Sequence, residues 1–375
     1  MTVLPADHPL CTRTANSPLV QASRGNRTDT LPVWFMRQAG RSLPEYRELR
    51  EGIDMLDSCL RPELASEITL QPVRRHGVDG AVFFSDIVVP LKLLGVDVDI
   101  VPGRGPVFAA PMRDADAVRE FAAKVRGEIT PEIFAPITEA VKLTVAELGD
   151  TPLIGFAGAP FTLAAYMVEG GPSKDHLRAR ALMRAEPDAW LELAAAIGEL
   201  SAAFLEAQIL AGASVVQLFD SWAGSLSRAT YASAVAPSSA IPLKRAAQFT
   251  TPDGERMRSI HFGVGTAELL TAMHETGGDV QGVDDRIPLD EAIARLGSNV
   301  PVQGNIDPAA LFAGDDHLHA HVRDVVRRGY SAPAHIVNLG HGVPPQADPT
   351  VLTRLVEFIH TLPATAGAAV HTGEF

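Results

Sequence analysis

Arginine is concentrated in one short segment of a chain that is acidic overall. Arg37, Arg41, Arg47 and Arg50 all lie within WFMRQAGRSLPEYRELR. A guanidinium group binds a carboxylate or phosphate through paired hydrogen bonds and keeps its charge at physiological pH. The segment therefore predicts a ligand that carries several carboxylates or phosphates. Surface ion pairs with nearby glutamates are the alternative, which suits Arg47 better than Arg37, because Arg37 directly follows an apolar run.

Three further side chains are of types that transfer protons or stabilise charge. They are Asp86 at the end of GAVFFSD, Tyr166 in FTLAAYMVEGG and His341 in NLGHGV. Each also has an ordinary structural explanation, since Asp86 can cap a helix, Tyr166 can pack within one, and His341 can satisfy a local hydrogen bond. Their shared placement, each after a different apolar run, favours one common site.

Short apolar runs rich in β-branched residues alternate with longer helical stretches. Eight runs are candidate strands: 32–36, 80–84, 153–156, 215–219, 259–262, 280–283, 301–303 and 335–339. Strands that alternate with helices pair with one another in parallel. Eight such strand–helix units predict a single (β/α)8 TIM barrel of the α/β class. Residues 96–107 predict a short β-hairpin inserted before the third strand. An open doubly wound sheet is the main alternative, but no GxGxxG follows the first strand.

Capping residues mark several helix ends. Asp188 and Gly212 are the predicted N-cap and C-terminal turn of one long apolar helix. Asp307-Pro308 and Asp348-Pro349 predict two further helix starts.

A barrel carries its reactive groups in the loops that follow the carboxyl ends of its strands. Polar residues follow six of the candidate strands: Arg37, Gln38, Gly40, Arg41 and Arg50; Ser85 and Asp86; Gly158, Thr162, Tyr166 and Glu169; Asp220, Ser221 and Trp222; Asn305 and Asp307; Asn338 and His341. The predicted fold would bring all of these loops to one mouth.

Composition excludes several classes of function. The formal net charge of −13 argues against binding to nucleic acid or to an anionic membrane. Cys11 and Cys59 are the two cysteines, so neither a disulfide framework nor a thiolate metal site is expected, and a reducing cytoplasm is the expected location. No uninterrupted apolar run reaches the roughly 18 to 20 residues of a membrane span.

The two ends of the chain lack hydrophobic period. Residues 1–29 and 363–375 are polar or small and predict disordered tails. The 375-residue chain therefore predicts one catalytic barrel domain over 30–362.

Five segments together resemble a known family. PVWFMRQAGRSLPEYRELR, GFAGAPFTLAAYMVEGG, FDSWAG, VQGNIDP and NLGHGVPPQADP are similar, in order and spacing, to the signature segments of the uroporphyrinogen decarboxylase family. The resemblance extends over about 31–362. One departure is Ser42, where many members have tyrosine in the first segment, and it affects the packing expected of that loop.

The resemblance implies a (β/α)8 barrel, a homodimer with facing clefts, and conversion of uroporphyrinogen III to coproporphyrinogen III without cofactor or metal. It implies the following site residues: Arg37, Arg41 and Arg50 for substrate carboxylates, Asp86 for the pyrrole N–H groups, and Tyr166, Ser221 and His341 around the ring. Asp86, Arg37, Tyr166 and His341 are the expected catalytic groups. The resemblance favours Arg37 as the proton donor, with His341, Tyr166 or a water molecule held by Arg37 as alternatives.

Three other functions remain open from the sequence. A thiol-activating methyltransferase shares the barrel, but it needs His and Cys zinc ligands late in the chain, where this sequence has no cysteine. A Schiff-base aldolase needs a lysine at a strand end, and no candidate strand ends in one. A noncatalytic porphyrin carrier is the third alternative, and only turnover distinguishes it from the enzyme.

Overall fold

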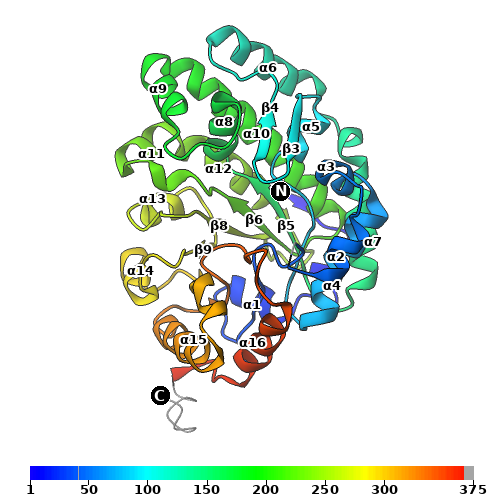
Figure 1. The fold of residues 1–375 in the computed structure, drawn as a ribbon, viewed down its shortest axis with the longest axis vertical. Helices are drawn as coiled ribbons and strands as arrows, with labels where there is room; N and C mark the ends of the chain where they lie inside the picture. Colours follow the sequence, from blue (N-terminus) through cyan, green and yellow to red (C-terminus); the bar gives the residue numbers. More distant parts are fainter. Residues whose placement is uncertain (41, 367–375) are drawn as a thin grey trace.

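The structure is a computed structural model that describes residues 1–40 and 42–366. In these residues seven parallel strands form one curled sheet, with helices packed around its outside (Figure 1). The strands, in spatial order, are β11 (His335–Ile336), β10 (Val302–Gln303), β9 (Val280–Gly282), β8 (Arg258–Phe262), β6 (Val215–Phe219), β5 (Leu153–Gly158) and β2 (Ala81–Val82). Neighbours in space are thus neighbours in sequence, whereas a doubly wound sheet reverses its order part-way.

The first predicted strand lies against both edges of this sheet. Val33 pairs in parallel with Val337, just beyond β11. The Val337 N–H donates to the Pro32 carbonyl (2.8 Å), and the Asp79 N–H, just before β2, donates to the Val33 carbonyl (2.8 Å). Backbone hydrogen bonds therefore run from this segment towards both edge strands.

Asp79 also ties this segment to the last helix, α16 (Pro349–Thr361). Its Oδ2 accepts the Val33 N–H (2.8 Å) and lies 2.8 Å from His360 Nε2. The hydrogen bond to Asp79 raises the pKa of His360 above its ordinary value of 6.5. A histidine with a raised folded-state pKa contributes stability that is complete below the unfolded pKa and is lost as pH rises through the folded pKa.

We therefore expect His360→Gln to lower the free energy of unfolding more at about pH 6 than at about pH 8.5, by roughly 0.5 to 1 kcal/mol. Urea unfolding of both proteins at the two pH values measures the difference. An equal loss at both values would contradict the assigned ion pair.

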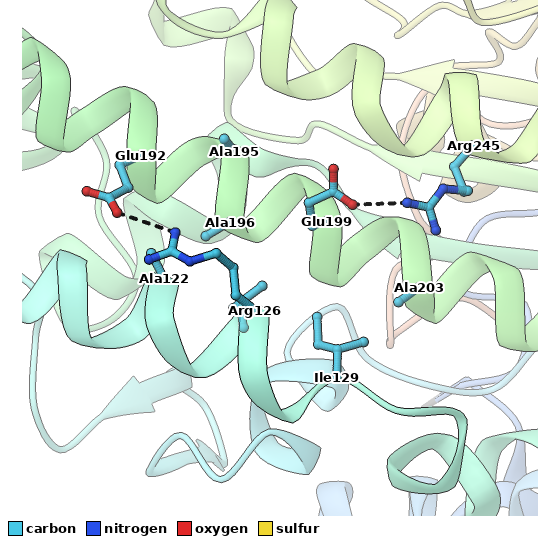
Figure 2. Close-up of a pocket in the computed structure, with 10 residues that line it drawn as sticks. Ala122, Arg126, Ile129, Glu192, Ala195, Ala196, Glu199, Ala203 and Arg245 are labelled. Atoms are coloured by element: carbon cyan, nitrogen blue, oxygen red, sulfur yellow. Dashed lines mark hydrogen bonds and ion pairs between the residues drawn. The ribbon is translucent and has the colours of Figure 1, made fainter.

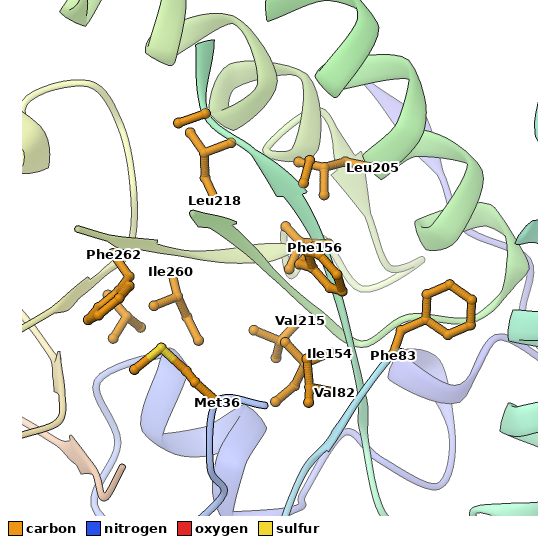
Figure 3. Close-up of a cluster of buried hydrophobic side chains, with 14 of the residues drawn as sticks. Met36, Val82, Phe83, Ile154, Phe156, Leu205, Val215, Leu218, Ile260 and Phe262 are labelled. Carbon is orange, nitrogen blue, oxygen red and sulfur yellow. The ribbon is translucent and has the colours of Figure 1, made fainter. Parts of the chain in front are cut away.

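The interior combines apolar packing with a short chain of polar side chains. Figure 3 shows one apolar cluster, which includes Met36, Val82, Phe156, Val215, Ile260 and Phe262. Burying one such side chain contributes about 1.5 to 3 kcal/mol. Trp34 Nε1 donates to Gln303 Oε1 (3.0 Å), and Gln303 Nε2 donates to Gln217 Oε1 (3.0 Å). These bonds satisfy polar groups that would be costly to bury alone.

The described helices alternate with the strands. They are α1 (Pro18–Ser23), α2 (Pro44–Leu49), α3 (Met55–Cys59), α4 (Pro62–His76), α5 (Val89–Leu93), α6 (Ala115–Glu128), α7 (Ala135–Glu147), α8 (Pro160–Glu169), α9 (Leu177–Ala185), α10 (Pro187–Ala211), α11 (Arg228–Ala234), α12 (Ala236–Ala246), α13 (Leu270–His274), α14 (Leu289–Leu296), α15 (Asp315–Gly329) and α16, with 3-10 turns η1 (Pro9–Cys11), η2 (Pro131–Phe134), η3 (Ala223–Ser225) and η4 (Pro308–Phe312).

The predicted helix starts at Asp307 and Asp348 are confirmed. Each carboxylate accepts the N–H two residues further on, at 2.8 Å. The predicted cap at Asp188 is wrong, because Pro187 already occupies the first turn of α10 and Asp188 lies inside it. In the first turn of α10, the carboxylate of Asp188 still interacts favourably with the positive N-terminal end of the helix dipole.

The N-terminal segment is packed into the fold, in contrast to the disordered tail predicted for residues 1–29. β1 (Thr2–Val3) pairs in parallel with β7 (Phe249–Thr250). Leu4, Leu10 and Leu19 are each at most 2% exposed. These isolated apolar residues have no period, so their burial depends on a surface formed by distant parts of the chain. Of the predicted C-terminal tail, 367–375 lies outside the described residues.

The hairpin predicted at 96–107 corresponds to β3 (Val98–Val101) and β4 (Gly105–Phe108), which pair antiparallel. The Phe108 N–H donates to the Gly170 carbonyl (3.1 Å), which joins the hairpin to the end of α8.

Helix α10 is long and apolar enough, by length and composition alone, to cross a membrane. In the fold, 67% of its most apolar 18-residue window is buried. It packs against α6, α7, α8 and α12 and against β5, so its apolar character belongs to the core.

Candidate active site

Arg37 follows the first strand segment in a tight turn. Its φ of 61° is left-handed, which is uncommon outside glycine. Buried Gln38 stabilises this turn, because its Oε1 accepts the Phe35 N–H (2.9 Å) and its Nε2 donates to the Gly80 carbonyl (2.9 Å). The turn leaves the Arg37 side chain exposed.

The Arg37 side chain lies along the NLGHGV segment. A Cβ atom built on Gly342 would lie 2.6 Å from Arg37 Cδ and 2.8 Å from its Cγ. A side chain at position 342 would force the Arg37 side chain to shift, so the glycine in the last loop permits this path of an arginine from the first.

Asp86 follows β2 and is partly exposed. The Val88 N–H donates to its Oδ1 at 3.0 Å. Burial raises the pKa of Asp86, while the Val88 hydrogen bond and the charge of Arg37 act against this rise. The carboxylate therefore lies within electrostatic reach of Arg37 in a partly desolvated position, where a charge acts strongly on its neighbours.

Tyr166 lies on α8, with its ring stacked on that of Trp222 at 3.8 Å between centroids. Burial raises the pKa of Tyr166 to about 12; the charge of Asp86 adds to this effect and that of Arg37 opposes it. The hydroxyl group thus keeps its proton at neutral pH and remains a hydrogen-bond donor.

His341 is exposed in the loop after β11. Surrounding protein lowers its pKa from the ordinary value, and the positive charge of Arg37 lowers it further. The imidazole is therefore neutral at neutral pH. The structure thus places Asp86, Tyr166 and His341, which come from two loops and from α8, within electrostatic reach of Arg37.

The guanidinium group of Arg50 is occupied by local partners. Its Nε donates to Ser58 Oγ (2.9 Å), its Nη2 donates to the Ile53 carbonyl (3.0 Å), and its Nη1 donates to the Tyr46 hydroxyl. The structure therefore holds this arginine firmly and leaves the second N–H of Nη1 and of Nη2 for a ligand. Arg41 lies outside the described residues.

Ser221 lies half-buried after β6, between two residues of a hydrogen-bonded chain. Thr162 Oγ1 donates to Asp220 Oδ1 (3.0 Å) and accepts the Trp222 N–H (3.2 Å). Asp220 is fully buried, and its Oδ2 lies 3.8 Å from His261 Nε2. In the sequence, the position of Asp220 and Trp222 after a strand was the signal for these hydrogen-bonded residues. The sequence did not show that Thr162 links them.

The sequence prediction missed Asp284 and Arg286, which follow β9. Asp284 Oδ2 accepts the Gly265 N–H (2.6 Å) and lies 3.7 Å from Arg286 Nε. Burial raises the pKa of Asp284. The charge of Arg286 contributes to lowering the pKa of His341, so this pair lies beside the same site. The signal was the run VDDR directly after an apolar strand.

Ser42 is 4% exposed, and its Oγ has no hydrogen-bond partner in the described part of the chain. The departure at this position thus leaves a small buried side chain in the loop after Arg37.

A groove of about 470 Å³ lies between α6 and α10, away from these residues (Figure 2). Ion pairs between Arg126 and Glu192 (3.5 Å) and between Arg245 and Glu199 (3.1 Å) line it. None of the candidate site residues contributes to its lining. Within the described residues, no group of three or more His, Cys, Asp or Glu side chains is placed to hold a metal ion.

Comparison with known proteins gives the family. The model of the uroporphyrinogen decarboxylase (URO-D) family matches residues 14–362. The chain belongs to the uroporphyrinogen decarboxylase family. It is 61% identical over 350 residues to a uroporphyrinogen decarboxylase from Arthrobacter sp. (strain FB24), which covers 93% of this chain and 98% of the relative. It is 59% identical over 371 residues to one from Leifsonia xyli subsp. xyli (strain CTCB07), which covers 96% and 98%.

Solved structures of lower identity share the fold of this family member. A methyltransferase from Methanosarcina mazei is 17% identical, with a TM-score of 0.72 over 92% of this chain and 98% of that one. A B12-independent methionine synthase from Shewanella sp. W3-18-1 is 12% identical, with a TM-score of 0.50 over 90% and 97%. At such identities the likeness concerns the fold alone.

Proposed function

We propose that this chain is a cofactor-independent decarboxylase that converts the four acetate side chains of uroporphyrinogen III into methyl groups, giving coproporphyrinogen III and four CO2 in porphyrin and heme biosynthesis. The observation that carries this proposal is the near full-length identity, 61%, to a relative named uroporphyrinogen decarboxylase. The grouping of Arg37, Asp86, Tyr166 and His341 supports it.

Loss of CO2 from a pyrrole acetate needs a sink for the departing electron pair. In the proposed reaction the substrate supplies the sink itself. Protonation of the pyrrole carbon beside the acetate-bearing position gives an iminium-like ring, which accepts the electrons as CO2 leaves. Protonation of the resulting exocyclic methylene gives the methyl group, and loss of the proton that was added to the ring carbon restores the aromatic pyrrole.

Asp86 is proposed to stabilise the cationic ring. A fixed carboxylate beneath the pyrrole N–H groups accepts their hydrogen bonds and favours the positive charge that develops there. The partly desolvated position of Asp86 strengthens this interaction, because the effective dielectric constant is low.

Arg37 is proposed as the proton donor, with His341, Tyr166 and a water molecule held by Arg37 as the alternatives. A guanidinium group is a weak acid, with a pKa above about 12. The neutral imidazole of His341 and the proton-bearing hydroxyl of Tyr166 are proposed to lie around the ring with Ser221.

Arg37, Arg41 and Arg50 are proposed to bind substrate carboxylates. Lysine keeps the charge but not the two-pronged geometry, so we expect Arg41→Lys and Arg50→Lys each to raise KM by about tenfold and to change kcat by less than about threefold. Steady-state kinetics measures both constants. Arg47→Lys is the matched control, because Arg47 is an exposed arginine of the same segment. An unchanged KM in both variants would contradict the carboxylate clamp.

The finer architecture is proposed as well. We propose that residues 32–36 act as the eighth strand and close the curled sheet into a (β/α)8 barrel, with the β3–β4 hairpin as an insertion and 30–362 as the catalytic unit. The hydrogen bonds of Val33 and Val337 towards both sheet edges support closure. We also propose that the protein is a homodimer in the cytoplasm. Its proposed ligand is a tetrapyrrole, and neither nucleic acid nor membrane is a proposed partner.

The decisive experiment is anaerobic incubation of the protein with uroporphyrinogen III and a metal chelator, followed by oxidation and separation of the porphyrins by carboxylate number. We expect stepwise appearance of products with seven to four carboxylates. Tight binding without loss of CO2 would favour a porphyrin carrier. Absence of both binding and turnover would contradict the proposal and favour a methyltransferase.

A further inference from the structure

Tyr166 belongs to a stack of three rings that extends beyond the candidate site. Its ring lies 3.8 Å from that of Trp222, with 28° between the planes. The other neighbour of Trp222 is His176, at 4.3 Å and 33°. Phe161 meets His176 edge-on at 6.1 Å. The indole of Trp222 is thus in contact with a candidate site residue and with a histidine that no motif includes.

His176 is itself held in place by its backbone and by hydrogen bonds. It is 4% exposed and has a left-handed φ of 50°, a conformation in which histidine and asparagine are enriched among non-glycine residues. Its N–H donates to Ser173 Oγ (3.0 Å), and its Nδ1 lies 3.0 Å from Ser225 Oγ. Ser225 Oγ in turn donates to the Trp222 carbonyl (3.0 Å). The imidazole ring therefore has a defined plane against the indole.

The backbone N–H of Trp222 is held independently of His176. Its N–H donates to Thr162 Oγ1 (3.2 Å), which donates to buried Asp220 (3.0 Å). The remaining freedom of Trp222 is the rotation of its side chain, and the rings of His176 and Tyr166 restrict that rotation.

We infer that His176 is a positioning residue for the proposed decarboxylation, which acts through Trp222 to fix the ring of Tyr166 beside Asp86 and Arg37. This inference rests on the proposed function. Misplacement of a reacting partner by about 1 Å can cost about 100-fold in rate. A hydroxyl group that must face the substrate ring therefore benefits from a rigid stack behind it.

Two substitutions separate the stack from the other roles of His176. His176→Asn keeps a residue that tolerates the left-handed backbone and an amide that can bond Ser225, but it removes the ring. His176→Phe keeps a ring and removes the hydrogen bond. His8→Asn is the matched control, because His8 is also 4% exposed and hydrogen-bonded. Its partners are Ile209 and Leu10, and none of these residues belongs to the candidate site.

We expect His176→Asn to lower kcat by about tenfold with KM within about twofold, and His176→Phe to restore part of the loss, because phenylalanine supplies the ring but is less favoured at a left-handed φ. His8→Asn should keep the kcat of the unchanged protein. Near-ultraviolet circular dichroism of the substrate-free proteins, with Trp222→Phe as the reference, should show loss of the stacked Trp222 signal in His176→Asn and its retention in His176→Phe.

The outcomes distinguish this inference from the proposed function. Absence of turnover in the unchanged protein would contradict the proposed function. Turnover there, together with a fully active His176→Asn variant or with equal losses in the Asn and Phe variants, would overturn the positioning role of His176 alone.

Discussion

Replacing Asp86 with asparagine should lower kcat by about 30- to 1,000-fold, or about 2 to 4 kcal/mol in activation free energy. Asparagine keeps the shape of the side chain and an oxygen that can accept the Val88 N–H. In the unchanged protein this N–H donates to Asp86 Oδ1 at 3.0 Å. It removes the negative charge that the cationic ring needs. Asp86→Ala should lose nearly all activity, because it removes both the charge and the acceptor.

Turnover of uroporphyrinogen III by the two variants measures this effect. Asp348→Asn is the matched control, since Asp348 also accepts the N–H two residues further on, at 2.8 Å, but caps the exposed start of α16. Full activity in Asp86→Asn would refute charge stabilisation by this carboxylate.

Replacing Arg37 with glutamine should lower kcat by about 100- to 10,000-fold, the range that general acids contribute. Arg37→Lys distinguishes between the proposed roles of the side chain. Lysine, with a pKa of about 10.4, is a stronger acid than arginine. If Arg37 itself donates the proton, Arg37→Lys should retain much more activity than Arg37→Gln, whereas a role in holding water or carboxylates should leave both variants impaired.

Gly342→Ala tests the placement of Arg37 without removing its charge. The new methyl group would lie 2.6 Å from Arg37 Cδ and must displace that side chain. We expect kcat to fall, but by less than in Arg37→Gln, because the guanidinium group is displaced and not removed. Gly127→Ala, on α6 where no atom lies within 4 Å of the added carbon, is the control. Unchanged kcat in both glycine variants would contradict a requirement for this position of Arg37.

The groups at the candidate site could be identified from local patterns. Asp86, Tyr166 and His341 follow apolar runs, and parallel strands bring the loops at their carboxyl ends together, so strand order in the sequence was enough to group them. The strands themselves were predictable because β-branched runs and helical periods alternate regularly.

Contacts between distant loops could not be predicted in this way. His176 lies in a loop after α8, and only the packing of that loop on η3 brings its ring to Trp222. The donors of Arg50 looked available in the sequence, yet the turn after α2 directs them to Ser58 and Ile53. In each case the partner is set by side-chain direction, which local spacing leaves open.

The sequence alone determined the kind of fold, the strands and the chemistry of the residues that follow them, because backbone propensity and hydrophobic period act over a few neighbouring residues. The tertiary structure decided which side chains touch. It packed Leu4, Leu10 and Leu19 of the N-terminal segment into the core, and it raised the pKa of Asp86 through burial. Burial and ring stacking depend on atoms far apart along the chain, and these meet only when the whole fold forms.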